Sequence, residues 1–248
     1  MKIAIFGDIH ANLEALNAVL GDAAAQGVSQ YACTGDIVGY CANPHECVEI
    51  IRGLGCPVVM GNHDEEAFRS QAITGMSDRA RLAMEWTREN LTAEDKAWLA
   101  SLPAVRQVRD FTVVHATLDS PKVWSYVMNR FDAMASFAYQ FTRVCFIGHT
   151  HSPVVYVKTQ TGVMRESAAE PIHIQSAQKY LINTGSVGMP RDGDPRAAYA
   201  LYDIERAVVT IRRVPYDIEG AAAKARRGPD SPRTAGAAER KREHGNRD

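Results

Sequence analysis

Short apolar runs that alternate with helix-like segments constrain the fold of this chain more than any other sequence feature. Residues 2–6, 31–33 and 57–60 are short and apolar, which predicts buried strands. Between them, residues 11–26 carry apolar side chains at helical spacing, and residues 44–54 are predicted as a second helix. Alternating strands and helices predict a parallel sheet covered by helices.

The pattern changes in the second half of the chain. Residues 66–102 are predicted to be helical, and a further helix is predicted around 131–141. The remaining apolar runs are strand-like, and they are residues 105–114, 144–147, 154–157, 179–182, 198–202 and 208–213. These runs predict an antiparallel or mixed sheet. We therefore expect an α/β protein with two sheets packed face to face and helices outside.

Composition is that of an ordinary globular protein. Of the 248 residues, 46% are hydrophobic and 23% are charged, and the formal net charge of −1 gives no indication of nucleic-acid or membrane binding. The first residues do not form a secretory signal, and no apolar run reaches the roughly 18 residues of a membrane span. We expect a cytoplasmic protein with a single domain over residues 1–227, which ends in a short helix at 218–227. Residues 228–248 are expected to form a polar, disordered tail.

Five of the apolar runs end in residues that commonly bind metals. One histidine after a strand is more often structural, but five of the eight histidines lie at such points. Ligands gather beyond the carboxyl ends of strands in sheets of this kind, so these side chains are expected to converge at one rim. They are Asp8, His10, Asp36, Asn62, His63, Asp64, His115, His149 and His151.

The number and spacing of these side chains favour two metal ions over one. Residues i and i+2 of an extended strand point the same way, about 6.5–7 Å apart, so His149 and His151 could lean onto ions about 3.5–4 Å apart. One ion could take both, but seven candidate ligands exceed the four of a tetrahedral zinc site. The five cysteines are scattered without a Cys-x-x-Cys pair, which argues against disulfides and a cysteine-built zinc site. An imidazole-rich set suits Mn, Fe, Zn or Ni better than Mg or Ca, and we favour two Mn²⁺ ions.

Such a centre carries more positive charge than its aspartates cancel. Two divalent ions bring four positive charges, of which two aspartates neutralise two. The centre therefore needs an anionic partner, and a bridging hydroxide together with a phosphate meets this need. Coordination lowers the pKa of water from about 15.7 toward about 7, which provides a nucleophile at neutral pH.

Five motifs follow one another along the chain: Asp8-Ile9-His10, Gly35-Asp36, Gly61-Asn62-His63-Asp64, His115 and Gly148-His149-Thr150-His151. This series resembles the calcineurin-like metallophosphoesterase superfamily, and within it the small bacterial phosphodiesterase-type subgroup. Each motif alone is a weak signal, but the complete series in order, over residues 3–214, is specific. The resemblance implies a four-layer α-β-β-α sandwich of two mixed sheets with flanking helices, the metallo-dependent phosphatase fold.

The resemblance also implies the metal ligands residue by residue. Asp36 would bridge two ions. The first ion would be held by Asp8, His10 and His151, and the second by Asn62, His115 and His149.

Further roles concern catalysis and the substrate. His63 resembles the histidine that hydrogen-bonds the phosphate, and it would protonate the leaving oxygen. Asp64 would orient the loop or the His63 imidazole, or would only cap the loop. Asn62 and His63 would contact the substrate. Arg191 is a candidate phosphate contact, with a surface ion pair as the alternative.

Two departures from related enzymes narrow the function. Ser/Thr protein phosphatases extend the second motif as Gly-Asp-x-x-Asp-Arg, but residues 35–40 read GDIVGY, so the second Asp and the Arg are missing. Small bacterial phosphodiesterases often carry Cys where this chain has His63, and a histidine suits a poorer leaving group. Residues 183–203 also resemble a late turn of a bacterial subgroup that usually has Pro in place of Thr184.

The resulting hypothesis is a dinuclear metal-dependent phosphodiesterase for a small nucleotide-like substrate. A metal-bridging hydroxide would attack phosphorus in line, and His63 would donate the proton. A phosphomonoesterase, protein phosphatases included, is one alternative; a non-catalytic scaffold is another, as in the retromer scaffold subunit. The expected partner is a small phosphorylated molecule, and a homo-oligomer is left open. Specificity is expected from residues 40–44, 65–80 and 117–130, none of which carries a readable code.

Overall fold

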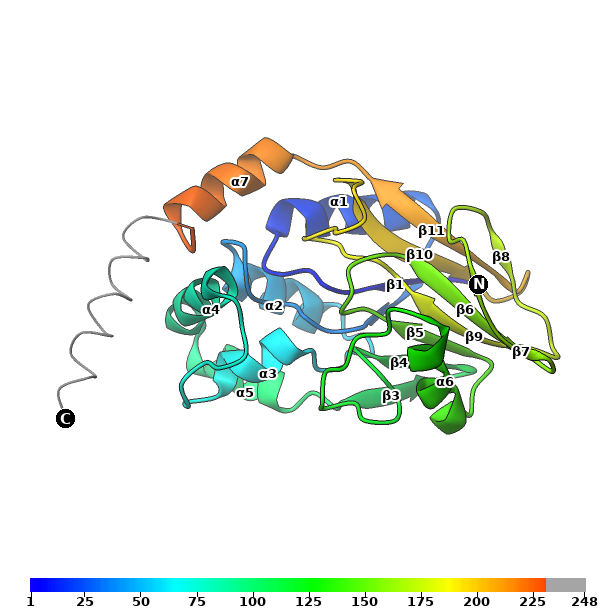
Figure 1. Ribbon diagram of the computed structural model, residues 1–248. Helices are drawn as coiled ribbons and strands as arrows, with labels where there is room; N and C mark the ends of the chain where they lie inside the picture. Colours follow the sequence, from blue (N-terminus) through cyan, green and yellow to red (C-terminus); the bar gives the residue numbers. More distant parts are fainter. Residues whose placement is uncertain (231–248) are drawn as a thin grey trace.

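Two mixed β-sheets form the centre of the molecule in the computed structural model, which describes residues 1–230 (Figure 1). The strands of the first sheet are β1 (Lys2–Phe6), β2 (Gln30–Cys33), β8 (Ile172–His173), β10 (Ala197–Asp203) and β11 (Val208–Val214). Those of the second are β3 (Val105–Val108), β4 (Phe111–Val114), β5 (Val144–Ile147), β6 (Val154–Thr159), β7 (Gly162–Glu166) and β9 (Lys179–Asn183). Their orders are β2-β1-β10-β11-β8 and β3-β4-β5-β9-β6-β7.

Alternating side chains in each strand divide the interior into three cores. In β1, Ile3 and Ile5 point into the core between the sheets, whereas Ala4 and Phe6 point toward the helices outside. β5 alternates in the same way between the central core and the core under a helix on the opposite side. The inner strands of both sheets are therefore buried on two faces, which requires helices on both outer surfaces.

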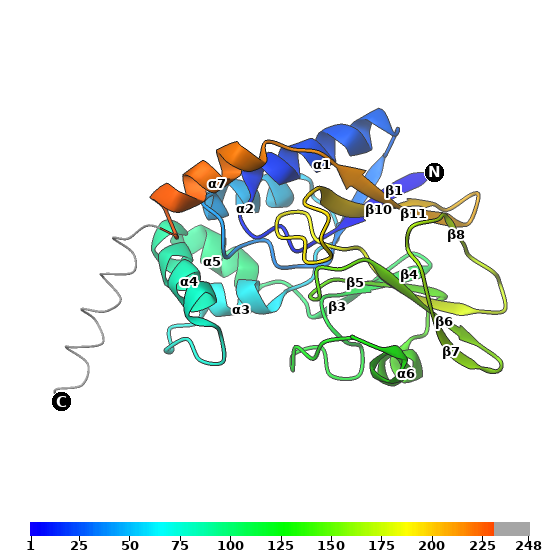
Figure 2. The same ribbon diagram turned by 45° about the horizontal axis from the view of Figure 1, so that its top comes forward.

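Helices cover both outer faces and complete the expected α-β-β-α sandwich (Figure 2). They are α1 (Leu13–Ala25), α2 (Pro44–Gly53), α3 (Asn62–Phe68), α4 (Asp78–Asn90), α5 (Ala93–Ala100), α6 (Arg130–Tyr139) and α7 (Ile218–Arg227). α1 and α2 pack on the first sheet, and α6 packs on the second. α3, α4 and α5 pack together beside α2, and α7 lies along α1.

Asn12 fixes the start of α1 and ties it to a distant loop. Its side-chain oxygen accepts a hydrogen bond from the Ala15 N–H (3.1 Å), which is the usual satisfaction of a free helix N-terminus. Its side-chain nitrogen donates to the Gly188 carbonyl (3.0 Å). The Gly188 N–H in turn donates to the Asp8 carbonyl (2.9 Å), so the loop after β9 is held against the loop after β1.

The strands predicted at 2–6 and 144–147 and the helix at 218–227 are confirmed with the same bounds. The strand predicted at 57–60 is wrong. Only Val58 forms a β-bridge, to Cys33, because the next residues leave the sheet for a loop and the Met60 N–H donates to the Pro103 carbonyl (2.9 Å).

Two other predicted segments are divided. Residues 105–114 form the hairpin of β3 and β4 rather than one strand, since the chain reverses at Arg109, whose φ is +55°. Residues 66–102 contain the end of α3, then α4 and α5, with an irregular stretch at 69–77. β7 and β8 were not predicted; β7 is largely exposed and β8 has two residues, so neither has a clear apolar pattern.

The last described residues are attached to the domain. Asp230 forms an ion pair with Arg79 of α4 (3.2 Å). From residue 231 onward, the predicted tail at 228–248 lies outside the described residues. No helix within residues 1–230 has the length and apolar character needed to cross a bilayer.

Candidate metal centre

Parallel strands of both sheets carry the motif residues to one place. β1 and β2 are parallel neighbours in the first sheet, and β4, β5 and β9 are parallel neighbours in the second. The connections that leave the carboxyl ends of these strands contain Asp8, Asp36, His115 and His149. The expected convergence at one rim is therefore observed.

Unusual backbone turns aim these side chains inward. Five of the candidate ligands have left-handed φ values between +48° and +69°, which few non-glycine residues adopt. They are Asp8, His10, Asp36, His149 and His151. The extended-strand explanation for His149 and His151 is therefore wrong: β5 ends at Ile147, and a turn, not the strand pleat, directs the two rings.

Two motif glycines allow the backbone to approach the carboxylates. A Cβ on Gly61 would lie 2.1 Å from Oδ1 of Asp36, and a Cβ on Gly148 would lie 2.5 Å from Oδ2 of Asp8. Atoms at these distances overlap, so any larger residue would displace the carboxylate. The glycines belong to the motifs for this steric reason.

The first group of candidate ligands is Asp8, His10, Asp36 and His151, all buried, with one ligand atom from each within 4.8 Å of the others. Nε2 of His10 lies 3.1 Å from Nε2 of His151 and 3.7 Å from Oδ2 of Asp36. Nε2 of His151 lies 3.4 Å from Oδ1 of Asp8. These separations suit four ligands of a single ion.

The second group is Asp36, His115 and His149, and it shares Asp36 with the first. Nε2 of His115 lies 3.1 Å from Nδ1 of His149 and 3.3 Å from Oδ1 of Asn62, which joins the group. Oδ2 of Asp36, the same oxygen that faces His10, lies 3.3 Å from Nε2 of His115. Asp36 is therefore placed to bridge two ions.

Backbone carbonyls fix the orientation of four histidines. In each case the ring nitrogen that points away from the centre donates its N–H to a carbonyl, which determines the tautomer. The pairs are His10 with Val38 (3.1 Å), His115 with Thr34 (2.9 Å), His149 with Trp124 (2.8 Å) and His151 with Met189 (2.6 Å). The inward nitrogens then carry lone pairs.

These lone pairs face each other at contact distance. In the neutral imidazoles, the acceptor nitrogens Nε2 of His10 and Nε2 of His151 lie 3.1 Å apart. Nε2 of His115 and Nδ1 of His149 are also 3.1 Å apart. Two acceptors without a shared proton or cation repel each other, and both pairs are buried. The donor set therefore fits two divalent cations.

The charges of the buried groups are consistent with a site built for cations. Burial raises the pKa of Asp8 to about 7 and lowers the pKa of His149 and His151 to about 3, with His115 and Arg191 adding to the two histidine shifts. Burial opposes the charging of His115 most strongly, but Asp36, Asp8 and the Thr34 carbonyl together outweigh it and raise the pKa of His115 to about 9. A proton on His115 thus stands in for the positive charge that an ion would bring.

The sequence matches the family model described as the calcineurin-like phosphoesterase superfamily domain over residues 1–207. The chain belongs to this superfamily. This membership confirms the family and the enzyme class predicted from the five motifs, a phosphoric ester hydrolase of the metallophosphoesterase type. Its two mixed sheets and flanking helices agree with those of metallophosphoesterases of known structure.

Several proteins are similar to this phosphoesterase along most of their length. The uncharacterized protein MJ0912 of Methanocaldococcus jannaschii is 38% identical over 218 residues, which cover 86% of this chain and 87% of that protein. A metallophosphoesterase from Sphaerobacter thermophilus has 39% identity and a TM-score of 0.81, with 92% and 93% of the two chains covered. The hypothetical protein PH1004 from Pyrococcus horikoshii OT3 shares the fold, with 20% identity, a TM-score of 0.71 and 90% and 91% coverage.

His63 lies beside the metal groups of the phosphoesterase. Its ring centroid is 4.8 Å from the ring centroids of both His10 and Tyr40. The backbone N–H of His63 donates to Oδ1 of Asp36 (2.8 Å). Nδ1 of His63 is buried and has no hydrogen-bond partner in the described part of the chain. Burial lowers the pKa of His63, and Asp36 partly opposes this change.

Asp64 connects two of the motif loops. Oδ1 accepts hydrogen bonds from the N–H groups of Ile37 (2.8 Å) and Val38 (3.3 Å), and Oδ2 accepts one from Gly61 (3.0 Å). These bonds fit the loop-orienting and capping roles considered for Asp64. The structure shows no bond from this carboxylate to the His63 ring.

Arg191 lies at the edge of the centre rather than within it. Its Nη2 is 3.5 Å from the Tyr40 hydroxyl, and its backbone N–H donates to the His151 carbonyl (3.3 Å). The guanidinium is exposed, and its charge contributes to lowering the pKa of both His63 and His151. Arg191 is therefore within electrostatic reach of an anion at the centre.

Sequence reasoning missed residues that support the centre through the backbone. Ser186 donates its hydroxyl to the Asp8 carbonyl (2.7 Å), and Asn183 donates to the Gly148 carbonyl (2.6 Å). Both lie in the segment at 183–203 that resembles a late turn of a bacterial subgroup, which was the available signal. The roles of the Trp124 and Met189 carbonyls could not be predicted from the sequence, because every residue has a carbonyl.

Proposed function

We propose that this phosphoesterase is a dinuclear metal-dependent phosphodiesterase that acts on a small nucleotide-like substrate. In this proposal Asp8, His10 and His151 bind one ion, Asn62, His115 and His149 bind the other, and Asp36 bridges them. We favour Mn²⁺, with Fe, Zn or Ni as alternatives, because imidazole predominates in the donor set.

One observation carries the proposal. In the His10–His151 pair and in the His115–His149 pair, the two inward ring nitrogens lie 3.1 Å apart, on either side of a single Asp36 oxygen, and in neutral imidazoles both nitrogens of each pair are acceptors. Two cations that share that oxygen would satisfy both pairs. A scaffold protein has no need of such an arrangement, since uncompensated buried polar atoms are costly.

The residues around the centre have distinct tasks in this proposal. When bound, the ions would lower the pKa of water and polarise the phosphoryl group. Arg191, which is exposed at the edge of the centre, would neutralise an oxygen of the phosphate. His63 would donate a proton to the leaving alcohol, and Asp64 would keep its loop in place by holding the backbone of residues 37 and 38.

The test compares a diester with a monoester. Purified protein loaded in turn with Mn, Fe, Zn and Ni is assayed with bis-p-nitrophenyl phosphate and with p-nitrophenyl phosphate. The proposal predicts turnover of both with a higher kcat/KM for the diester, and loss of activity in Asp36→Ala together with loss of bound metal. A higher kcat/KM for the monoester would favour the phosphomonoesterase alternative, and no turnover with any metal would remove the enzyme proposal.

A further inference from the structure

Tyr126 presents an open aromatic face next to the metal centre. Its ring is stacked on the ring of His149, with centroids 4.1 Å apart and an angle of 14° between the planes. Half of the residue is nevertheless exposed (50%). One face of the phenol therefore covers a candidate metal ligand, while the rest of the ring remains accessible.

The loop that carries Tyr126 is held in place on two sides. The Trp124 carbonyl accepts the His149 ring N–H (2.8 Å), and the Trp124 indole donates to Oε2 of Glu65 (2.9 Å). Glu65 belongs to α3 and also forms an ion pair with Arg69 (2.8 Å). On the other side, the N–H of Met128 donates to Oδ2 of Asp132, in the first turn of α6 (2.9 Å). The ring of Tyr126 is thus positioned before any ligand arrives.

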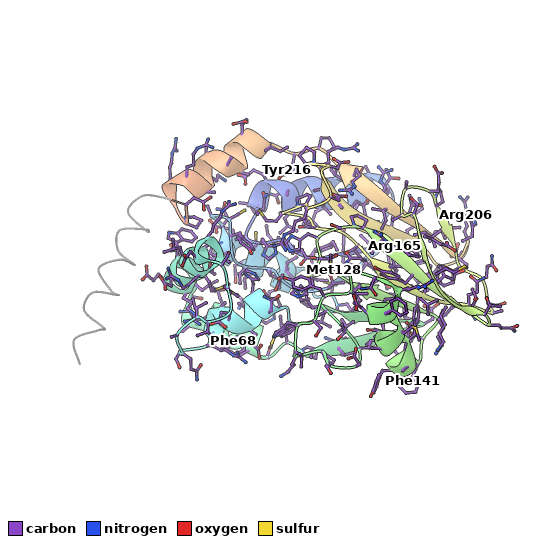
Figure 3. All side chains as sticks on the ribbon, viewed as in Figure 1. Phe68, Met128, Phe141, Arg165, Arg206 and Tyr216 are labelled. Carbon is purple, nitrogen blue, oxygen red and sulfur yellow. The ribbon has the colours of Figure 1, made fainter. Side chains whose placement is uncertain are left out.

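Trp124 in this loop has a strained backbone conformation, which also indicates that the surrounding structure holds the loop in place. Its φ is +60°, in a region that bulky residues rarely occupy. Such conformations cost free energy and persist where the surrounding structure enforces them, often at ligand sites. Met128, which Figure 3 labels, belongs to the same loop and is 63% exposed.

A second aromatic residue lies on the other side of the centre. The Tyr40 ring contacts His10 and His63 at centroid distances of 4.9 and 4.8 Å, and φ of Tyr40 is +61°. Its hydroxyl meets Arg191 at 3.5 Å. A phosphate at the centre would therefore have Arg191 beside it and an aromatic face within reach.

We infer that Tyr126 forms a subsite for a planar group of the substrate, a nucleobase or other aromatic ring that stacks on its exposed face while the phosphate lies at the metal centre. This inference rests on the proposed function and names its substrate class: phosphodiesters of nucleosides. Stacking on a phenol requires only a π-face, so the subsite accepts different bases. Discrimination against esters without a planar group follows from the same contact.

The test uses two diesters with one leaving group. Thymidine 5′-p-nitrophenyl phosphate and methyl p-nitrophenyl phosphate both release p-nitrophenol. They differ in the alcohol that stays on the phosphate, which is thymidine with its planar base in one ester and methanol in the other. The ratio of their kcat/KM values is measured in the wild type, Tyr126→Leu and Tyr126→Phe. The matched control is Tyr139→Leu, which makes the same change at an exposed tyrosine of α6 (58% exposed).

Tyr126→Leu is expected to lower this ratio by about tenfold or more, equivalent to about 1.4 kcal/mol. Tyr126→Phe and Tyr139→Leu are expected to keep the wild-type ratio. An unchanged ratio in Tyr126→Leu overturns the inference. Equal losses on both esters, accompanied by less bound metal, also overturn it, because the ring would then serve only to hold His149.

A binding measurement separates the subsite from the activity. Calorimetric titration of the Mn-loaded protein with thymidine 5′-monophosphate and with methyl phosphate gives two dissociation constants. We expect the nucleotide to bind about tenfold more tightly or better, and Tyr126→Leu to remove this difference. If the difference is present but neither ester is hydrolysed, the subsite stands and the proposed function fails. If both esters are hydrolysed without a difference in binding, the subsite fails and the function stands.

Discussion

At the scale of single residues, the centre depends on where hydrogen atoms can lie. Four histidines are fixed by carbonyls outside the centre, so in their neutral form the remaining ring nitrogens present lone pairs toward Asp36 and one another. His63 differs from them, because its Nδ1 has no such carbonyl within the described residues. This difference separates His63, which we propose to move a proton, from the histidines that we propose to hold ions.

His63→Ala is expected to keep the metal and lose most of the activity. General acid catalysis contributes about 10²–10⁴-fold, so kcat should fall within that range. Elemental analysis measures the metal and steady-state kinetics measure kcat, with His45→Ala as the control at an exposed histidine of α2. Full activity in His63→Ala would remove this residue from the mechanism.

Gly61→Ala is expected to disturb the centre although it adds a single methyl group. The new Cβ would lie 2.1 Å from Oδ1 of Asp36, so the carboxylate must move. Gly21→Ala in α1 is the matched control, since no heavy atom lies within 4 Å of its Cβ and alanine favours a helix by about 0.5–1 kcal/mol. The metal content and the melting temperature should fall only for Gly61→Ala. Unaltered metal binding in that variant would show that the close approach is unimportant.

At the scale of elements, prediction succeeded where one strand has one uninterrupted apolar run. β1 and β5 were predicted with their observed bounds because both are buried on two faces and are followed by a glycine. The hairpin of β3 and β4 was not predicted, because its turn uses Arg109 in a left-handed conformation rather than a glycine or asparagine. The candidate ligands could be predicted from the sequence because their side chains carry recognisable chemistry. Their orientation was not found, since it depends on turns and carbonyls that leave no mark in the sequence.

The contact between α2 and α5 provides a prediction about pH. A hydrogen bond from Nδ1 of His45 to Oδ2 of Asp95 (2.8 Å) raises the pKa of His45 above its usual 6.5. The folded state therefore favours protonated His45, and this stabilisation is complete below pH 6.5 and is lost as the pH rises through the raised pKa. Because His45 is half exposed, the effect should not exceed about 1 kcal/mol.

Urea unfolding of the wild type and of His45→Gln at about pH 5.5 and about pH 8.5 measures this effect. The wild type should be more stable than the variant at the lower pH, and the difference should shrink at the higher pH. Other titrating groups are common to both proteins and cancel in the difference. A difference that grows with pH would contradict the assigned hydrogen bond.

At the scale of the whole molecule, the metal centre joins the two sheets. Asp8 and Asp36 follow strands of the first sheet, whereas His115 and His149 follow strands of the second. Ions bound between them would therefore link the two halves of the sandwich. Bound metal should contribute to global stability and not only to activity.

Added Mn²⁺ is expected to raise the melting temperature of chelator-treated protein. A ligand that binds only the folded state at 100 times its Kd stabilises that state by about 2.7 kcal/mol. Differential scanning fluorimetry across a Mn²⁺ titration measures the shift, with Mg²⁺ as a comparison that should act more weakly on an imidazole-rich site. An equal shift in Asp36→Ala would show that the ion binds elsewhere.

The most direct test of the account is anomalous X-ray diffraction at the manganese edge from crystals grown with Mn²⁺. A dinuclear centre should give two peaks about 3.5–4 Å apart on either side of Asp36. One should lie among Asp8, His10 and His151, and the other among Asn62, His115 and His149. A single peak that draws in both groups, or peaks away from these side chains, would contradict it.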